Sequence, residues 1–248
     1  MHKLPSLAKI SVATALASLA LASSAFAQDS STSSTAVGLE ISSPIYQYTI
    51  DPGKVQQDII KIKNIGSTEQ TYYPAVADFK SDNKTGTPIF LKKGESSGTY
   101  SLSEWVSVST APIKLVPNQS TAINFNITVP AAAEPGGHYA GILFTTQPPS
   151  PTGGNQIGLA NTLGSLILVR VSGDAKESAK ITEFKTDKTQ YDSTNVKFST
   201  TVNNDGNVHV QPKGVISVKN IIGGQVAAID VNQLSANVLP GSSRIFES

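Results

Sequence analysis

Short stretches that alternate apolar and polar residues, each closed by a turn, run from Gly38 to the end of the chain. The clearest is "STAINFNITV" (120–129), whose apolar residues fall on one face of a strand and whose polar residues fall on the other. Almost nothing in this range repeats with the helical period of about 3.6 residues. Short strands at this spacing predict an all-β protein built of sandwiches.

Turn signals separate the expected strands, because proline fixes φ while glycine and asparagine admit left-handed backbone. These signals are Asp51-Pro52-Gly53, Asn64-Ile65-Gly66, Pro117-Asn118 and Pro135-Gly136-Gly137. The strands expected between residues 38 and 172 cover 38–42, 46–50, 55–64, 70–79, 104–110, 120–129, 138–146 and 162–172.

The stretch "PGGHYAGILF" (135–144) predicts a central strand. Ala140, Ile142 and Phe144 fall on one of its faces. The other face carries Tyr139, Gly141 and Leu143, so neither side is polar and both are expected to be buried. Gly141 marks a position where a neighbour comes close.

A second unit repeats features of the first. Asn64, Gly66 and Pro74 recur as Asn204, Gly206 and Pro212, and "LVPNQSTAINF" (115–125) is echoed by "VLPGSSRIFES" (238–248). The repeat predicts two tandem immunoglobulin-like β-sandwiches, at residues 38–172 and 180–248, joined by a linker at 173–179.

The second sandwich is expected to be incomplete at its C-terminus. Two strands follow the proline turn in the first unit, whereas none follows it in the second. The second unit is also shorter than the roughly 100 residues that a seven-stranded sandwich uses. Either the chain is a fragment of a longer product, or another polypeptide supplies the last strands.

The N-terminus has the three parts of a secretory signal peptide. His2, Lys3 and Lys9 form a cationic start, residues 10–22 are weakly apolar, and Ala25-Phe26-Ala27 fits the cleavage rule. We therefore expect a signal peptide at 1–27 and a flexible Ser/Thr-rich spacer at 28–37. The protein is expected to be exported, to the cell surface or the periplasm.

Composition excludes several classes. The chain has no cysteine, which rules out disulfides, thiolate metal sites and a lipid anchor on cysteine. The signal peptide holds two of the 19 basic residues and none of the 18 acidic ones, which leaves 17 against 18. This balance does not favour nucleic acid. Membrane attachment is expected only through a possible anchor beyond Ser248.

No set of residues typical of a catalytic, metal or cofactor site is found. The only histidines after the signal peptide, His138 and His209, are predicted to lie on strands as structural residues. The stretch "DFKSDNKTG" (78–86) could hold calcium, but it lacks the ligand rhythm of a calcium loop and is better interpreted as a hairpin turn. The glycine-rich stretch 152–158 lacks the lysine of a phosphate loop. We expect neither enzymatic activity nor a cofactor.

Trp105 is the one residue singled out as a candidate ligand contact. In an expected strand it alternates with Ser107 and Ser109, so its ring would lie on the wetter face and could stack on a sugar or anchor a partner. The alternative is that the ring covers the rim of the sandwich beneath a loop.

Residues 38–172 resemble the N-terminal domain of the WxL-interacting proteins, which are exported bacterial surface proteins. The resemblance rests on "IDPGKVQQDIIKIKNIG", "EWVSVS" and "LVPNQSTAINFNITV", followed by the PGG strand. It implies an immunoglobulin-like domain associated with peptidoglycan, and it places Trp105 and residues 135–144 at positions characteristic of the family.

These observations predict a non-enzymatic cell-surface scaffold or adhesion-type protein that binds cell-wall polymer (peptidoglycan) or another surface protein. Two alternatives remain. One is a periplasmic chaperone-like protein that acts by strand exchange at an exposed edge. The other is an accessory module of a polysaccharide-acting enzyme.

Overall fold

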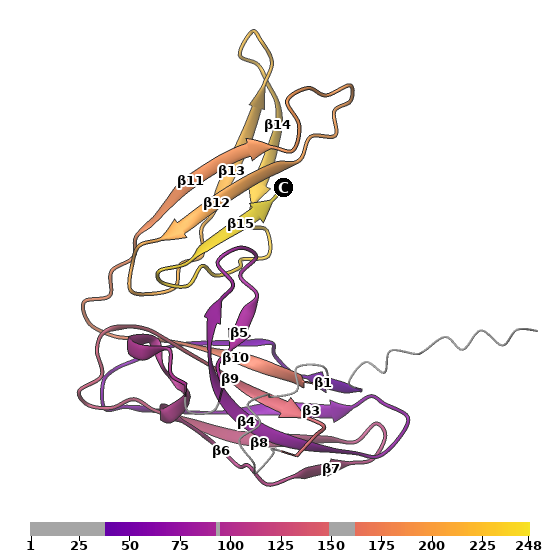
Figure 1. The fold of residues 1–248 in the computed structure, drawn as a ribbon, viewed down its shortest axis with the longest axis vertical. Helices are drawn as coiled ribbons and strands as arrows, with labels where there is room; N and C mark the ends of the chain where they lie inside the picture. Colours follow the sequence, from indigo (N-terminus) through magenta and orange to yellow (C-terminus); the bar gives the residue numbers. More distant parts are fainter. Residues whose placement is uncertain (1–37, 93–94, 149–161) are drawn as a thin grey trace, which may run out of the picture. The chain divides into compact units, whose positions relative to one another are not determined.

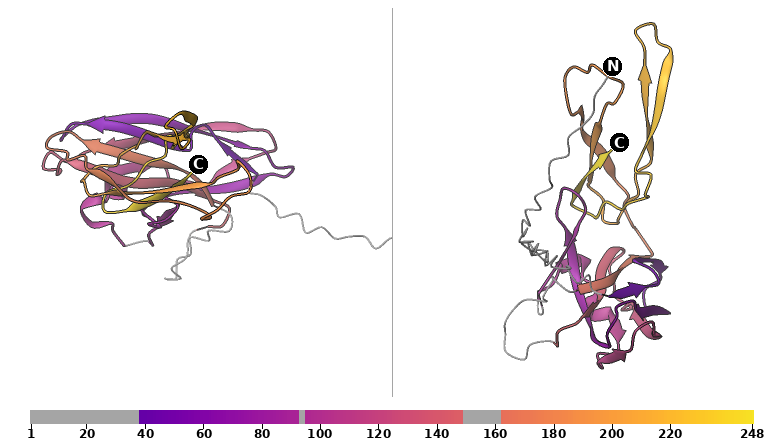
Figure 2. Two further views of the ribbon diagram at one scale, coloured as in Figure 1. Left: turned by 90° about the horizontal axis from the view of Figure 1, so that it is seen from above. Right: turned by 90° about the vertical axis from the view of Figure 1, so that its right-hand side faces the viewer.

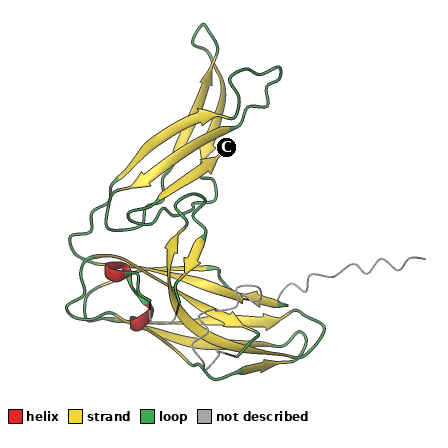
Figure 3. Cartoon of the chain, in the orientation of Figure 1, coloured by secondary structure: helices red, strands yellow, loops and turns green. Residues whose placement is uncertain are grey.

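The computed structural model describes residues 38–92, 95–148 and 162–248. The expected signal peptide (1–27), the spacer (28–37) and the glycine-rich stretch 152–158 lie outside these ranges. The described chain is built of strands, with two short 3₁₀ turns, Gly98–Tyr100 (η1) and Ser103–Trp105 (η2) (Figure 3). The prediction of an all-β protein with two immunoglobulin-like sandwiches is confirmed, while the expected incompleteness of the second one stays a prediction. Both sandwiches belong to one compact unit, Thr35–Ser248.

Two sheets form the first sandwich (Figure 1). One sheet has the order β1-β3-β8-β6, with bounds Leu39–Ile41, Val55–Asn64, Ser120–Thr128 and Val106–Val108. The other has the order β2-β10-β9-β4-β5, with bounds Ile45–Ile50, Thr162–Val171, Gly136–Thr145, Gln70–Ser81 and Pro88–Phe90. A further short strand, β7 (Ile113–Leu115), pairs with the start of β4.

Strand β9 is the central strand predicted from the absence of a polar face. It lies between β10 and β4, and every residue from Gly136 to Phe144 is buried. Ala140, Ile142 and Phe144 face the main core between the two sheets. On the opposite side, a Cβ added at Gly141 would lie 2.6 Å from Cε1 of Phe90, which confirms the expected close approach.

A second apolar cluster covers the outer face of β9. It is centred on three buried residues, Phe79, Tyr139 and Leu168. Residues packed against them come from β5, β10, η1 and the second sandwich: Phe90, Leu166, Tyr100 and Leu239. The outer face of this sheet is therefore buried because distant segments meet there.

The second sandwich has a three-stranded sheet and a two-stranded sheet. The order of the first is β11-β12-β15, with bounds Ala179–Thr186, Phe198–Asn204 and Ser243–Glu247. The second pairs β13 (Gly214–Lys219) with β14 (Gln225–Val231) (Figure 2). Among the described residues its core cluster has only three buried members, Val202, Val238 and Phe246.

Asn64 and Asn204, which the internal repeat relates, make equivalent hydrogen bonds in the two sandwiches. The buried Asn64 side chain donates to the carbonyl oxygens of Thr68 and Leu115, at 2.8 and 2.9 Å. Asn204 donates to those of Val208 and Val238 at the same two distances. In both units the asparagine oxygen accepts the N–H of the glycine two residues later.

The repeat aligns the strands of the two sandwiches. The pairing of Gln70 with Leu115 recurs as the bridge between Val210 and Val238. Strands β3, β8 and the 74–79 part of β4 therefore correspond to β12, β15 and β13. The counterpart of Pro74 in this alignment is Gly214, so the expected match of Pro74 with Pro212 was wrong. Within the described residues, the second sandwich has no counterpart of β9 and β10.

Several local expectations were wrong. His209, expected on a strand, lies in a loop that covers residues 205–209, because Asn204 fixes a turn at Gly206. The expected strand 104–110 is shortened to β6, since η2 occupies residues 103–105. Strands β5, β7 and β14 were not anticipated. No helix in the described ranges has the length and apolar character needed to cross a bilayer.

Candidate functional site

Trp105 lies at the end of η2, not on a strand. Its ring centroid is 4.3 Å from that of His138, and the indole packs partly buried against the main core. Ser107 and Ser109 are exposed as expected, but Trp105 does not share their face. The position fits the alternative in which the ring covers the rim of the sandwich, and a ligand-binding role for Trp105 stays a prediction.

His138 closes the core beside Trp105. It is buried, and its Nδ1 and Nε2 lie 3.0 and 3.2 Å from the backbone carbonyl oxygens of Ser101 and Glu134. Both ring nitrogens are thus engaged by the backbone. The position is that of a structural histidine at the start of a central strand.

Asp78 and Asp82, the carboxylates of the stretch 78–86, turn to different partners. The Asp78 carboxylate accepts the N–H groups of Leu102 and Ser103, at 3.0 and 2.8 Å. Asp82 accepts backbone N–H groups of its own turn, from Lys84 to Gly86. Within the described ranges, no group of three or more histidine, aspartate or glutamate residues is placed to hold a metal ion.

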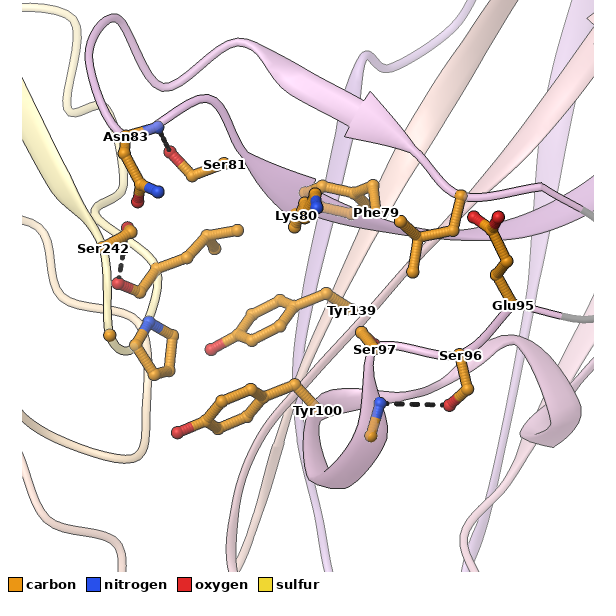
Figure 4. Close-up of a pocket in the computed structure, with 15 residues that line it drawn as sticks. Phe79, Lys80, Ser81, Asn83, Glu95, Ser96, Ser97, Tyr100, Tyr139 and Ser242 are labelled. Atoms are coloured by element: carbon orange, nitrogen blue, oxygen red, sulfur yellow. Dashed lines mark hydrogen bonds between the residues drawn. The ribbon is translucent and has the colours of Figure 1, made fainter.

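A cleft of about 640 Å³ lies over the second apolar cluster (Figure 4). Phe79, Tyr100 and Tyr139 line it with aromatic rings, and the two tyrosines point their hydroxyl ends toward the segment that carries Ser242. Polar residues complete the lining: Lys80, Ser81, Asn83, Glu95, Ser96, Ser97 and Ser242.

Two polar groups of this cleft, the hydroxyls of Tyr139 and Ser242, are committed to structure, whereas the buried Ser97 hydroxyl has no hydrogen-bond partner. The Tyr139 hydroxyl accepts the backbone N–H of His209 at 2.9 Å, and burial raises its pKa above the usual range, so it stays protonated. The Ser242 hydroxyl donates to the carbonyl oxygen of Leu239. The cleft is therefore chiefly the place where the two sandwiches contact each other.

A groove of about 450 Å³ opens in the second sandwich, between its two sheets. Ile181 and Phe184 of β11 form one wall and are 66% and 54% exposed. Ile216 of β13 faces them from the other sheet, and the edge of β13 around Val215 completes the lining. The large apolar side chains of β11 face this sheet and are nevertheless exposed, which indicates a core that is not closed.

This groove lies beside the strand edge that β9 occupies in the first sandwich. There, residues 73–78 of β4 pair with β9, and the repeat maps them onto residues 213–218, which are Lys213 and the first five residues of β13. In the described structure β13 pairs only with β14, so its other edge is open. A Cβ added at Gly214 would meet no atom within 4 Å, whereas the corresponding Pro74 is buried.

Thr200 is the polar residue at the base of the groove. It is 3% exposed, and its Oγ1 has no hydrogen-bond partner. The repeat places it where the first sandwich has Ile60, which is fully buried in the main core. A buried hydroxyl without a partner is costly, by about 1–3 kcal/mol.

An open sheet edge beside apolar walls can accept an extended polypeptide as an added strand. Val196, Phe198, Thr200 and Val202 alternate along the sequence and so fall on one face of a strand, and the structure turns Thr200 and Val202 inward. The polar Thr200 among these apolar residues is the feature of the sequence that points to the groove. The exposure of Ile181, Phe184 and Val215 could not be inferred from the sequence, because it depends on which strands are present.

No protein-family model and no curated protein matches this chain. Solved structures of similar fold include the class 5 fimbriae chaperone CfaA, 12% identical with a TM-score of 0.44, where 83% of each chain is covered. The Escherichia coli chaperone DraB is 12% identical with a TM-score of 0.39, covering 85% of this chain and 86% of its own. The Pseudomonas aeruginosa CupB2 chaperone has the same identity and TM-score, with 84% and 87% covered. At these values the likeness concerns the fold alone.

Proposed function

We propose that this is an exported, non-enzymatic protein that binds a segment of another exported polypeptide, in the manner of an assembly chaperone. The binding mode is strand addition at an open sheet edge, which uses main-chain hydrogen bonds for affinity and side-chain pockets for selectivity. The cell-surface scaffold that binds cell-wall polymer, and the accessory module of a polysaccharide-acting enzyme, stay predictions.

The observation that carries the proposal is the open groove of the second sandwich. Its two walls present apolar side chains, and the adjacent edge of β13 is unpaired in the described structure. Natural sheets usually blunt or cover such an edge, because it pairs readily with other chains. An apolar wall beside a free edge supports polypeptide binding over binding of a polar glycan.

Two further features agree with this role. His138 and His209, the histidines of the described residues, are held by the backbone and by Tyr139 and serve packing. The signal-peptide pattern of residues 1–27 directs the chain out of the cytoplasm, where unfolded exported subunits need protection.

The test measures peptide binding to purified residues 28–248. Fluorescent ten-residue peptides, some alternating apolar and polar residues and some entirely polar, are titrated by anisotropy. We expect the alternating peptides to bind with micromolar affinity and the polar ones not to bind. Ile181→Lys, on the wall of the groove, should weaken binding at least tenfold.

Val226→Lys is the matched control, because Val226 is 62% exposed, close to the 66% of Ile181, but lies outside the groove. It should bind as the unmodified protein does. A parallel assay measures co-sedimentation with peptidoglycan sacculi. Retention on sacculi together with no peptide binding would replace the proposal by the scaffold function.

A further inference from the structure

A loop of the second sandwich, residues 205–209, is hydrogen-bonded to the start of β9 in the first. The backbone N–H of Gly137 donates to the carbonyl oxygen of Asn207 at 2.7 Å, and the Asn207 side chain donates to the carbonyl oxygen of Pro135 at 3.2 Å. A Cβ added at Gly136 would lie 2.8 Å from the same oxygen of Asn207. The loop therefore fits closely against this part of β9, and we call this contact the joint.

His209 is the titratable residue of the loop. Its backbone N–H donates to the Tyr139 hydroxyl at 2.9 Å, and its Nδ1 lies 3.3 Å from the same hydroxyl. The two rings meet edge to face, with centroids 5.7 Å apart. Because Tyr139 belongs to β9 and is buried, a change in the protonation of His209 acts directly on the joint.

The groups around the imidazole disfavour a positive charge. Arg170 of β10 opposes it, while Glu177 of the linker favours it and forms an ion pair with Arg170. The titratable groups on the remaining side are Tyr139 and, packed against its ring, Tyr100 of η1. Burial is the largest influence, and together with Arg170 it lowers the pKa of His209 to about 4 from 6.5.

Proton binding is linked to opening of the joint. In an open form His209 lies in water, where its pKa returns to about 6.5, so the open form binds a proton at a higher pH than the closed form. Acid therefore favours the open form. From pH 7.5 to pH 5 the ratio of open to closed molecules should rise about 30-fold, as follows from these two values.

We propose that Tyr139 and His209 form an acid-sensitive latch: uptake of a proton by the imidazole releases loop 205–209 from β9 and lets the second sandwich move away from the first. Leu239 of the second sandwich packs on the apolar cluster of Phe79, Tyr139 and Leu168, so release uncovers part of this cluster. The latch goes beyond the proposed function and does not depend on what fills the groove of the second sandwich.

Hydrogen exchange of residues 28–248, followed by NMR at pH 7.5 and pH 5, tests the latch. The first reporters are the amides of Gly137 and His209, which donate across the joint. Their protection factors, which are corrected for the intrinsic pH dependence of exchange, should fall about 30-fold. At both pH values they should be lower than those of amides paired between β3 and β8, because the joint opens without unfolding of a sandwich.

The amide of Ile245 distinguishes separation of the sandwiches from fraying of the loop. This N–H, on β15, donates to the carbonyl oxygen of Lys84 at 2.8 Å, in the turn that follows β4. The bond joins the two sandwiches at a place outside loop 205–209. If the sandwiches separate, the protection factor of Ile245 should fall in parallel with that of Gly137.

Two variants assign the effect to the imidazole. In His209→Gln, whose side chain does not titrate, the protection factors of Gly137 and Ile245 should differ by less than about twofold between the two pH values. Arg170→Gln keeps the histidine but removes the positive charge that faces it. The closed form then binds the proton more readily, so the fall should be smaller than in the unmodified protein.

Three results would each overturn the latch. The first is equal protection of Gly137 at both pH values. The second is a fall at Gly137 and His209 with none at Ile245, which would mean that the loop frays while the sandwiches stay together. The third is a fall of the same size in His209→Gln. None of these results bears on peptide binding, and failure of peptide binding leaves the latch intact.

Discussion

The backbone N–H of His209 donates a hydrogen bond of 2.9 Å to the hydroxyl of Tyr139, and the hydroxyl lies 3.3 Å from Nδ1 of the same histidine. Tyr139 belongs to β9 of the first sandwich, and His209 lies in the loop that follows β12 of the second. The second contact suits a hydroxyl that donates to Nδ1 of a neutral imidazole, the form that burial of His209 also favours.

Stability should therefore fall as the pH is lowered through the titration of His209. Burial, reinforced by Arg170, lowers the pKa of His209 to about 4 from 6.5. Between these values the unfolded chain binds the proton more readily, so stability decreases from pH 6.5 toward pH 4. The loss is on the order of 3 kcal/mol, at about 1.4 kcal/mol for each pKa unit.

Urea unfolding at a series of pH values measures this loss. Carboxylates titrate in an overlapping pH range. The quantity to compare is therefore the difference in unfolding free energy between the unmodified protein and His209→Gln, whose polar side chain does not titrate. The variant should have the shallower profile. Identical profiles would show that the pKa of His209 does not differ between the folded and the unfolded protein, and would contradict the prediction.

Replacing either repeat asparagine should destabilise its own sandwich. Asn64→Ala removes two donated hydrogen bonds, of which the one to the carbonyl oxygen of Leu115 is buried, so we expect a loss of about 1–3 kcal/mol. Asn204→Ala should act in the same way on the second sandwich. Denaturant unfolding measures both, and Asn124→Ala on the exposed face of β8 should change stability by less than about 0.5 kcal/mol.

Adding a methyl group at Gly141 should overpack the outer face of the sheet. The new Cβ would lie 2.6 Å from the ring of Phe90, and β9 cannot move away because it is paired on both sides. We expect Gly141→Ala to lower the unfolding free energy by about 1–3 kcal/mol. Combining it with Phe90→Leu should recover part of the loss, and additive effects in this double-mutant cycle would contradict the contact.

Asp78→Asn should loosen the segment that contains η1 and η2. Burial tends to raise the pKa of Asp78, but hydrogen bonds from Ser101, Leu102 and Ser103 outweigh it and hold the pKa below its usual value. An amide turns one acceptor into a donor that faces these N–H groups, so we expect a loss of about 2 kcal/mol. Faster hydrogen exchange at Leu102 and Ser103 is the measurement, with the exposed Asp174→Asn as control.

The sequence by itself determined the strands and turns of this protein. Alternation along 120–129 predicted one wet and one buried face, and the absence of a polar face in 136–144 predicted a central strand. The recurrence of Asn64 at Asn204 predicted a second copy of the same unit. These features are local, since a side chain's face in a strand follows from its position in the chain.

Only the tertiary structure decided what covers those faces. The outer side of β9 is buried because Phe79, Leu168 and Leu239 meet Tyr139 there, from segments far apart in the chain. Trp105 left its expected strand because η2 brings the indole onto His138. Gly136 and Gly137 serve a contact as well as a turn, since the Gly137 N–H donates to the carbonyl oxygen of Asn207. The groove beside β13 likewise forms only where the two sheets of the second sandwich enclose Thr200. Whether a side chain is buried depends on its neighbours in space and not on the local sequence pattern.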